Sequence, residues 1–312
     1  MAVAQRRRQR AGWGIMRRRE AWAGVLFVLP CVLGLIIFTA YPVLASVYLS
    51  FTDYNIIQPP HWVGLQNYVT MFTSDNDFWT GVGNSAYYAL ISVPLGLIIS
   101  LLLALTLNLR ARGVGVYRAL FYLPALAPPV VSTIIFVMLL DPNNGLVNVL
   151  LRGIGLPTPG WFVDPAWSKP ALIMLSLWGA GTATIIFLAG LQEVPQSLLE
   201  AAVIDGAGPW QRLWNVILPL LSPVVLFNLV MGVISSFQVF DQAITIGGNN
   251  GDPLGSTLMF MILIYRSAFQ YFQMGYASAL SMALFLVVVS ITAVIFRTSR
   301  AWVYYEGEQR GA

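Results

Sequence analysis

The chain has 312 residues, of which 57% are hydrophobic and only 10% are charged, and its mean hydropathy is +0.72. Soluble domains carry about 25% charged residues, so this composition excludes an ordinary soluble protein and predicts a membrane protein. The formal net charge of +4 comes largely from the arginine-rich residues 6–20. Because an apolar run follows, this segment indicates a cytoplasmic flank rather than an arm that binds nucleic acid.

Six apolar runs are long enough to cross a bilayer, which takes about 20 residues. They lie at residues 22–47, 86–109, 119–140, 171–191, 218–239 and 277–296. We therefore predict an all-α membrane protein with six transmembrane helices. A seventh apolar stretch, residues 256–265, is too short to span and fits a helix at the outer face or packed on the bundle. The first run could instead be a signal peptide cleaved near residues 43–46, but it exceeds the usual apolar region of about 7–15 residues.

The distribution of positive charge predicts the orientation. With six spans, fourteen of the Lys and Arg residues fall in the inner segments, and only Arg152, Lys169 and Arg266 fall outside. Cytoplasmic loops carry such an excess of Lys and Arg. We therefore expect a multi-pass protein of the bacterial cytoplasmic membrane with both termini inside. Its parts would be a basic N-terminus at 1–20, a membrane domain at 21–300 and a cytoplasmic tail at 301–312.

The chain has few residues for chemistry. Cys31 is its one cysteine and lies in an apolar run, and His61, its one histidine, lies in an outer loop. No nucleotide-binding P-loop, HExxH or CxxC motif occurs. We expect no catalytic residue, no metal site and no cofactor bound by this chain. Asp241, at the outer end of the fifth span, is the nearest candidate for a charge within a span.

Prolines cluster at residues 123–129 and recur at Pro94, Pro219 and Pro223. Proline in a spanning helix frees backbone carbonyls, which neighbours or water must satisfy. The prolines fit a protein with a polar path or moving helices, and simple packing kinks explain any one of them equally well.

Residues 192–218 are too polar to span and would face the cytoplasm. A short helix is predicted from Pro195 to Gly206, since proline favours helix starts and glycine favours helix ends. A second helix is predicted from Pro209, followed by a turn at Pro219 into the next span. Its apolar stripe is formed by Trp210, Leu213, Trp214 and Ile217. The segment carries Glu193, Glu200 and Asp205 against Arg212, which favours a protein partner over a lipid surface.

The stretch "EAAVIDGA…ILP" resembles the EAA loop of permease subunits of binding-protein-dependent ABC importers. Other stretches resemble the carbohydrate branch, in particular the family of the maltose-transporter F-type subunit. They lie at residues 63–72, 117–128, 177–178, 235–241 and 264–269. Residues 244–253 depart from that family's pattern, and we expect only a local change in an outer loop.

The resemblance implies a role for each residue of the motif. Glu200 would pair with a basic residue of a cytoplasmic ATPase, Ala201 and Ala202 would lie in its groove, and Gly206 would make the turn. Asp205, Ala207 and Pro219 complete the motif. The implied partners are two ATPase subunits that carry ATP and Mg, a second homologous permease and an extracellular or periplasmic solute-binding protein. The bilayer is a further partner, and nucleic acid is not one.

The resemblance also places the solute near the midplane, on the fourth and fifth spans. The polar residues available there are Ser176, Trp178, Thr182, Ser235, Ser236 and Gln238. Hydroxyls, an amide and an aromatic ring suit a neutral mono-, di- or oligosaccharide. Each of these serines and threonines could equally be a helix-packing residue.

Two other classes of function and one other substrate remain alternatives. An importer of a non-sugar solute such as glycerol-3-phosphate would need a counter-charge, and no Lys or Arg lies in a span interior. A stand-alone secondary transporter often shows an internal repeat, and we find no convincing one. A membrane-embedded enzyme would need a catalytic cluster, which the sequence lacks.

Overall fold

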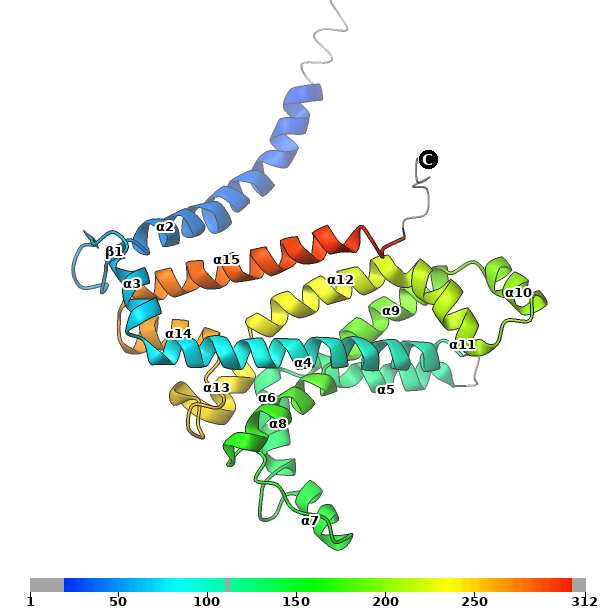
Figure 1. Ribbon diagram of the computed structural model, residues 1–312. Helices are drawn as coiled ribbons and strands as arrows, with labels where there is room; N and C mark the ends of the chain where they lie inside the picture. The colour runs from blue at the N-terminus through cyan, green and yellow to red at the C-terminus, as the bar shows by residue number, and fades with distance from the viewer. Residues whose placement is uncertain (1–19, 110–112, 305–312) are drawn as a thin grey trace, which may run out of the picture.

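The computed structural model describes residues 20–109 and 113–304 (Figure 1). The predicted basic N-terminus, apart from Glu20, and most of the predicted C-terminal tail lie outside the described residues. Most of the described chain is helical, as predicted. The exception is one antiparallel pair of two-residue strands, β1 (Thr52–Asp53) and β2 (His61–Trp62).

The first apolar run forms one helix, Glu20–Leu49, which includes a π-helical turn η1 (Ile36–Ala40) and α2 (Tyr41–Leu49). The next elements are α3 (Gln66–Thr73), α4 (Asn76–Leu107), α5 (Val114–Leu126), α6 (Pro129–Leu139) and α7 (Leu146–Gly153). They are followed by α8 (Pro165–Trp178), α9 (Gly181–Glu193), α10 (Gln196–Ile204), α11 (Pro209–Arg212), η2 (Leu213–Ile217) and α12 (Leu218–Phe237). The last are α13 (Asp241–Gly247), η3 (Gly248–Asn250), α14 (Phe260–Tyr265), η4 (Arg266–Gln270) and α15 (Met274–Ser299).

Helix α4 is the central element and contacts α8, α9, α12 and α14. It begins at Asn76, well before the predicted start at residue 86. Asp75 explains the earlier start, because one of its carboxylate oxygens accepts hydrogen bonds from the N–H groups of Asp77 and Phe78 at 2.9 and 3.1 Å. This is an N-terminal cap, which a search for apolar residues alone does not detect.

Two of the predicted spans are broken helix pairs. Helices α5 and α6 meet at 98°, and α8 and α9 meet at 47°. The first break falls in the proline cluster, where Pro128 and Pro129 lack the N–H groups that would continue the hydrogen-bond ladder. The described residues therefore contain four helices long and apolar enough to span, or up to six if each bent pair is one span.

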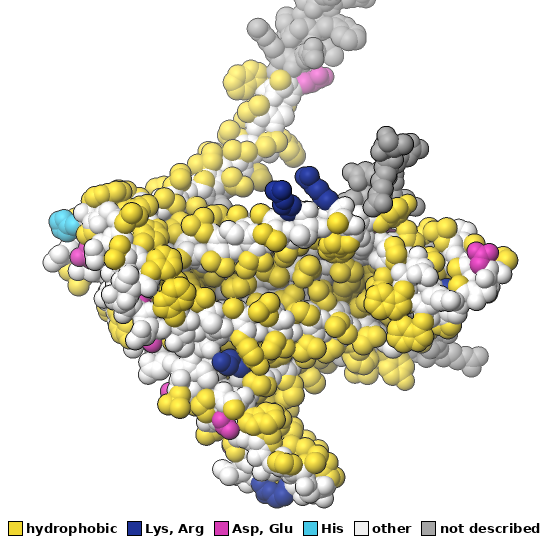
Figure 2. Space-filling view, viewed as in Figure 1, with side chains coloured by type: hydrophobic (Ala, Val, Ile, Leu, Met, Phe, Trp, Pro, Cys, Tyr) yellow, Lys and Arg dark blue, Asp and Glu magenta, His cyan; other side chains and the backbone are white. Residues whose placement is uncertain are grey.

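Helices α4, α12 and α15 run side by side, whereas α6, α7 and the start of α8 extend to one side of them (Figure 1). Helices α10 and α11 lie at one end of the molecule, near the C-terminal end of α15. The strand pair, α3, α13 and α14 lie toward the other end. Hydrophobic side chains cover most of the visible surface between the two ends (Figure 2), as a bilayer requires.

The buried core has two parts. The smaller part includes Leu107, Phe187 and Leu221, which come from α4, α9 and α12. Small residues bring the helices close there: a Cβ added at Gly181 would lie 2.9 Å from the Phe121 carbonyl oxygen of α5. Such close approach is typical of helix packing within membranes.

The larger part of the core contains α14, whose Phe260, Ile262 and Leu263 are buried. This helix packs against α4, where a Cβ at Gly81 would lie 2.5 Å from Leu263 Cδ1. The prediction of a short, non-spanning helix packed on the bundle is confirmed.

Candidate functional site

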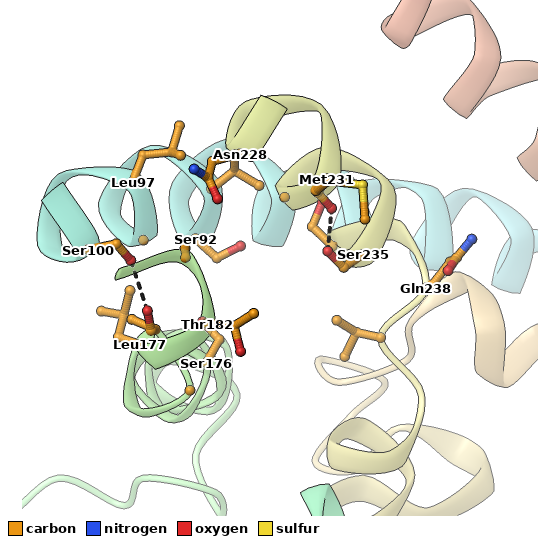
Figure 3. A pocket seen from close by; sticks show the side chains of 18 of the residues that line it. Ser92, Leu97, Ser100, Ser176, Leu177, Thr182, Asn228, Met231, Ser235 and Gln238 are labelled. Carbon is orange, nitrogen blue, oxygen red and sulfur yellow. Dashed lines mark hydrogen bonds between the residues drawn. The ribbon is translucent and has the colours of Figure 1, made fainter. Parts of the chain in front are cut away.

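A cavity of about 570 Å³ lies between α4, the α8–α9 break, α12 and the start of α13. We call it the central cavity. Its volume falls within the range of about 300–1,000 Å³ that small-molecule sites have. Figure 3 shows Ser92 and Ser100 from α4, Ser176 from α8, and Asn228 and Ser235 from α12 around this space.

The polar lining of the central cavity consists of neutral groups with one exception. The hydroxyl and amide groups come from Tyr88, Ser92, Ser100, Ser176, Thr182, Asn228, Ser235, Ser236, Gln238 and Gln242. The exception is the carboxylate of Asp241. Apolar residues such as Val93, Leu97, Phe227 and Met231 complete the walls. A mixed lining of this kind suits a solute that carries both hydroxyls and apolar surface.

Five of the six residues predicted for the solute path line the central cavity: Ser176, Thr182, Ser235, Ser236 and Gln238. Trp178 does not. Its side chain is 53% exposed, and its ring packs edge-on against Phe136 with centroids 5.5 Å apart. Ser176 lies on the cavity-facing side of α8, and Trp178 lies about 200° around the helix from Ser176.

Three serine hydroxyls of the cavity donate to carbonyls of their own helices. Ser176 Oγ donates to the Ile173 carbonyl at 2.6 Å, Ser236 Oγ to the Val233 carbonyl at 2.8 Å, and Ser235 Oγ to the Met231 carbonyl. These hydroxyls retain acceptor capacity. Gln238 follows the end of α12, and within the described residues its side-chain amide has no hydrogen-bond partner. It can therefore both donate to a solute and accept from it.

Helix α4 contributes Tyr88, Ser92 and Ser100, and α12 contributes Asn228, none of which was predicted for the path. Ser100 Oγ donates to the Ala180 carbonyl at 3.2 Å, next to the α8–α9 break. In the sequence, these residues are recognisable as polar residues within apolar runs. That pattern alone does not distinguish a residue that lines a cavity from one that packs between helices.

A second candidate site is the segment 192–218, which we call the EAA segment. Within it, α10 ends at Ile204 and α11 begins at Pro209, with a turn between them. At the turn, the Gly206 N–H donates to the Val203 carbonyl at 3.0 Å and the Ala207 N–H to the Ala202 carbonyl at 2.9 Å. Gly206 has φ +80°, the left-handed conformation that this helix ending requires and that glycine adopts without strain.

The path from the EAA segment into the next helix differs from the prediction. The Gly208 N–H donates to Gln211 Oε1 at 2.8 Å, and α11, η2 and α12 then continue as helix from Pro209 to Phe237. The predicted turn at Pro219 is therefore wrong. Pro219 lies in the first turn of α12, where a missing N–H is tolerated, and the preceding π-helical turn accommodates its ring.

The EAA segment is well exposed. Glu200, Ala201 and Asp205 are exposed, Ala202 and Ala207 are half-buried, and Ile204 is 86% exposed. The rings of Trp210 and Trp214 are 72% and 63% exposed. Acidic side chains lie at the tip of this end of the molecule (Figure 2). An exposed apolar surface with carboxylates beside it is typical of a surface that another protein covers.

The described residues include no group of three or more His, Cys, Asp or Glu side chains that could hold a metal ion.

The fold is that of the membrane subunit of an ABC importer. It is similar to a chain in a solved bacterial ABC transporter that imports the acidic polysaccharide alginate, with a TM-score of 0.80 and 26% identity over 93% of this chain and 98% of that one. Residues 92–300 match the family model described as the binding-protein-dependent transport system inner membrane component. The chain belongs to this family.

Similar sequences extend the match to nearly the whole chain. A probable ABC transporter permease, YesP of Bacillus subtilis, is 41% identical, and 94% of this chain and 95% of that one are covered. The trehalose/maltose permease MalF of Thermococcus litoralis is 32% identical, with 91% and 96% covered. The glycerol-3-phosphate permease UgpA of Yersinia pestis is 31% identical, with 92% and 97% covered.

Membership of this family makes the chain a multi-pass inner-membrane transport subunit rather than a catalytic enzyme. It also sets aside the alternative of a stand-alone secondary transporter.

Proposed function

We propose that this chain forms part of the path by which a sugar, delivered by an external binding protein, crosses the bacterial cytoplasmic membrane. The observation that carries the proposal is the central cavity, whose polar lining consists of hydroxyls and amides with a single carboxylate. A sugar offers many hydroxyls, each of which needs a partner once water is removed. The trehalose/maltose permease and the lactose permease LacF of Rhizobium radiobacter, 31% identical, support this substrate class.

Within this path, Gln238 and Thr182 supply groups that can donate and accept, whereas Ser176, Ser235 and Ser236 supply mainly acceptor oxygens. Trp178, through its contact with Phe136, supports the packing of α6 against α8. The solute contacts thus come from both sides of the α8–α9 break and from the end of α12.

The six-span topology follows if each bent pair is one span. The end of the molecule that carries α10 and α11 then faces the cytoplasm, and both termini lie on that side. Arg118, Arg212, Arg297 and Arg300, which belong to the inner set, support this orientation. The membrane domain is residues 21–300, with the EAA segment as its cytoplasmic extension.

The EAA segment is the contact with a cytoplasmic ATPase. Its surface is exposed, its turn is fixed by Gly206, and it continues into α12, which lines the central cavity. Motion imposed on α10 can thus pass through the turn at Gly206 to the continuous helix from Pro209 to Phe237, which lines the solute path. Glu200 pairs with a basic residue of the ATPase, and the small side chains of Ala201 and Ala202 let the two surfaces approach closely.

The working complex contains this chain, a second homologous permease, two ATPase subunits with ATP and Mg, and the binding protein. A solved alginate transporter, 25% identical over 91% of this chain, is in complex with a sugar-bound periplasmic protein and supports this composition.

The test is ATPase activity of the purified complex with binding protein that has been loaded with candidate sugars. We expect one neutral sugar to stimulate ATP hydrolysis, and we expect no stimulation from unloaded binding protein. Glycerol-3-phosphate is the second candidate because of the relative UgpA. Stimulation by glycerol-3-phosphate alone would replace the sugar proposal.

A further inference from the structure

Asp241 is the one residue with a full charge among those that line the central cavity in the described part of the chain. It is the first residue of α13 and follows the stretch 238–240, which connects α12 to α13 at the outer end of the path. The cavity lining provided by the described residues contains no Lys, Arg or His.

The Asp241 carboxylate is exposed and free of an ion pair within residues 20–109 and 113–304. The hydrogen bond recorded at this residue involves its main chain: Thr245 Oγ1 donates to the Asp241 carbonyl at 2.6 Å. Two of the three predicted outer cations are engaged elsewhere, and the third, Arg152, lies in α7 outside the cavity lining. Arg266 pairs with Asp77, and Lys169 donates to Asn84 Oδ1 at 3.1 Å. No cation among the described residues is recorded as a partner of this carboxylate, which lines the cavity.

A carboxylate beside a partly apolar cavity acts more strongly on a solute than it would in open water. Apolar walls lower the local dielectric constant, and a narrow space excludes some of the screening ions. An anionic solute in the central cavity would face repulsion and would find no cation there to compensate for its lost hydration. A neutral solute would instead find an additional strong acceptor for its hydroxyls.

We propose that Asp241 sets the charge selectivity of the solute path, so that neutral and cationic sugars pass and acidic sugars and phosphate esters are rejected. The proposal rests on the proposed function and narrows its substrate class. The proposed exclusion of anions would distinguish the substrate of this chain from those of two similar proteins. One solved neighbour imports an acidic polysaccharide, and one relative, SmoG of Agrobacterium fabrum, 33% identical, is a sulfoquinovosyl glycerol permease.

The test measures how the charge of the cavity affects the reaction rates of charged thiol reagents, so the solute need not be known. Cys31 is the one cysteine of the chain, so Cys31→Ala provides a background without thiols in this subunit. Ser235→Cys, or Thr182→Cys as a second position, then places a thiol on the cavity wall. The assembled complex is treated with two methanethiosulfonate reagents of similar size, one with a trimethylammonium group and one with a sulfonate. The ratio of their reaction rates cancels differences in thiol ionisation.

We expect the cationic reagent to react faster, and we expect the cation-to-anion ratio to fall about three- to tenfold in Asp241→Asn. Asp53→Asn, which removes an exposed carboxylate in β1 outside the cavity lining, should leave the ratio unchanged. An unchanged ratio in Asp241→Asn would overturn the proposal. So would failure of both thiols to react, because the cavity would then be closed to hydrophilic solutes. Failure of the proposed function would appear separately, as absence of sugar-stimulated ATPase activity with a normal reagent ratio.

Discussion

The guanidinium of Arg266 in η4 forms an ion pair with the carboxylate of Asp77 in the first turn of α4. Beside it, the Tyr276 hydroxyl of α15 donates to Asp75 Oδ2 at 2.5 Å, while Asp75 Oδ1 caps α4. The start of α4 is thus joined to η4 and α15, which follow 189 and 201 residues later, at the end of the bundle that we propose faces outward. The ion pair lies directly after α14, which packs against α4, and α4 lines the central cavity.

Asp77→Asn should destabilise the complex by about 1–3 kcal/mol, because it leaves the buried Arg266 guanidinium without its counter-charge. The measurement is thermal unfolding in detergent. Asp53→Asn, in the same outer region, should change stability by at most about 0.5 kcal/mol. A melting temperature for Asp77→Asn equal to that of the Asp53 variant would show that the ion pair does not hold these elements together.

Glu200→Lys should abolish transport and leave the chain in the membrane, because it places a positive charge against the basic residue expected on the ATPase. Co-purification of the ATPase, together with uptake, is the measurement. Glu193→Lys provides a matched control at another exposed acidic residue, before α10. Wild-type uptake by Glu200→Lys in an intact complex would contradict the assigned role.

Gly206→Pro should also abolish transport, since proline cannot adopt the φ of +80° that ends α10 and has no N–H to donate to Val203. Gly206→Asn should retain much of the activity, because asparagine tolerates the left-handed region better than other residues do. If the proline and asparagine variants transport equally well, the turn geometry does not matter for coupling.

Gln238→Leu should reduce uptake, normalised to assembled complex, more than Ser290→Leu does. Gln238 lines the central cavity and its amide is free to bind a hydroxyl, whereas Ser290 is exposed on α15 and lies outside the cavity lining. Loss of one hydrogen bond costs about 0.5–1.5 kcal/mol, or roughly a twofold to thirteenfold effect, and leucine also fills space. Equal normalised uptake in the two variants would remove Gln238 from the path.

Ser236→Leu should differ from Ser235→Leu. Ser236 is 6% exposed and donates to the Val233 carbonyl at 2.8 Å, so leucine there should lower assembly as well as transport. Ser235 is exposed to the cavity, and its replacement should lower transport with little loss of complex. The amount of complex recovered by co-purification separates the two effects, and equal recovery of both variants would contradict this distinction.

The sequence was sufficient for the helical class and for the short helix that contains Phe260, and five of the six path candidates line the central cavity. It failed where geometry depends on contacts between elements. The start of α4 depends on the Asp75 cap, and the 98° bend between α5 and α6 depends on how consecutive prolines are packed. Trp178 was assigned to the path because an aromatic ring suits a sugar. Its ring packs on Phe136 instead, because the position of a side chain around its helix, and not its chemistry, decides what it faces.

Orientation can be tested with single cysteines in the Cys31→Ala background. Gln66 and Ser197 are both exposed, the first at the start of α3 and the second in α10. An impermeant thiol reagent added to whole cells should label Gln66→Cys and should label Ser197→Cys only after the cells are opened. Labelling of Ser197→Cys in intact cells would place the EAA segment outside and would contradict the topology.

The most direct test of the account is uptake of labelled sugar into vesicles that contain the full complex, with ATP enclosed and loaded binding protein outside. The account predicts uptake that requires ATP, the ATPase subunits and the binding protein, and that is lost in Glu200→Lys. Sugar uptake that persists without ATP or without the ATPase subunits would contradict it.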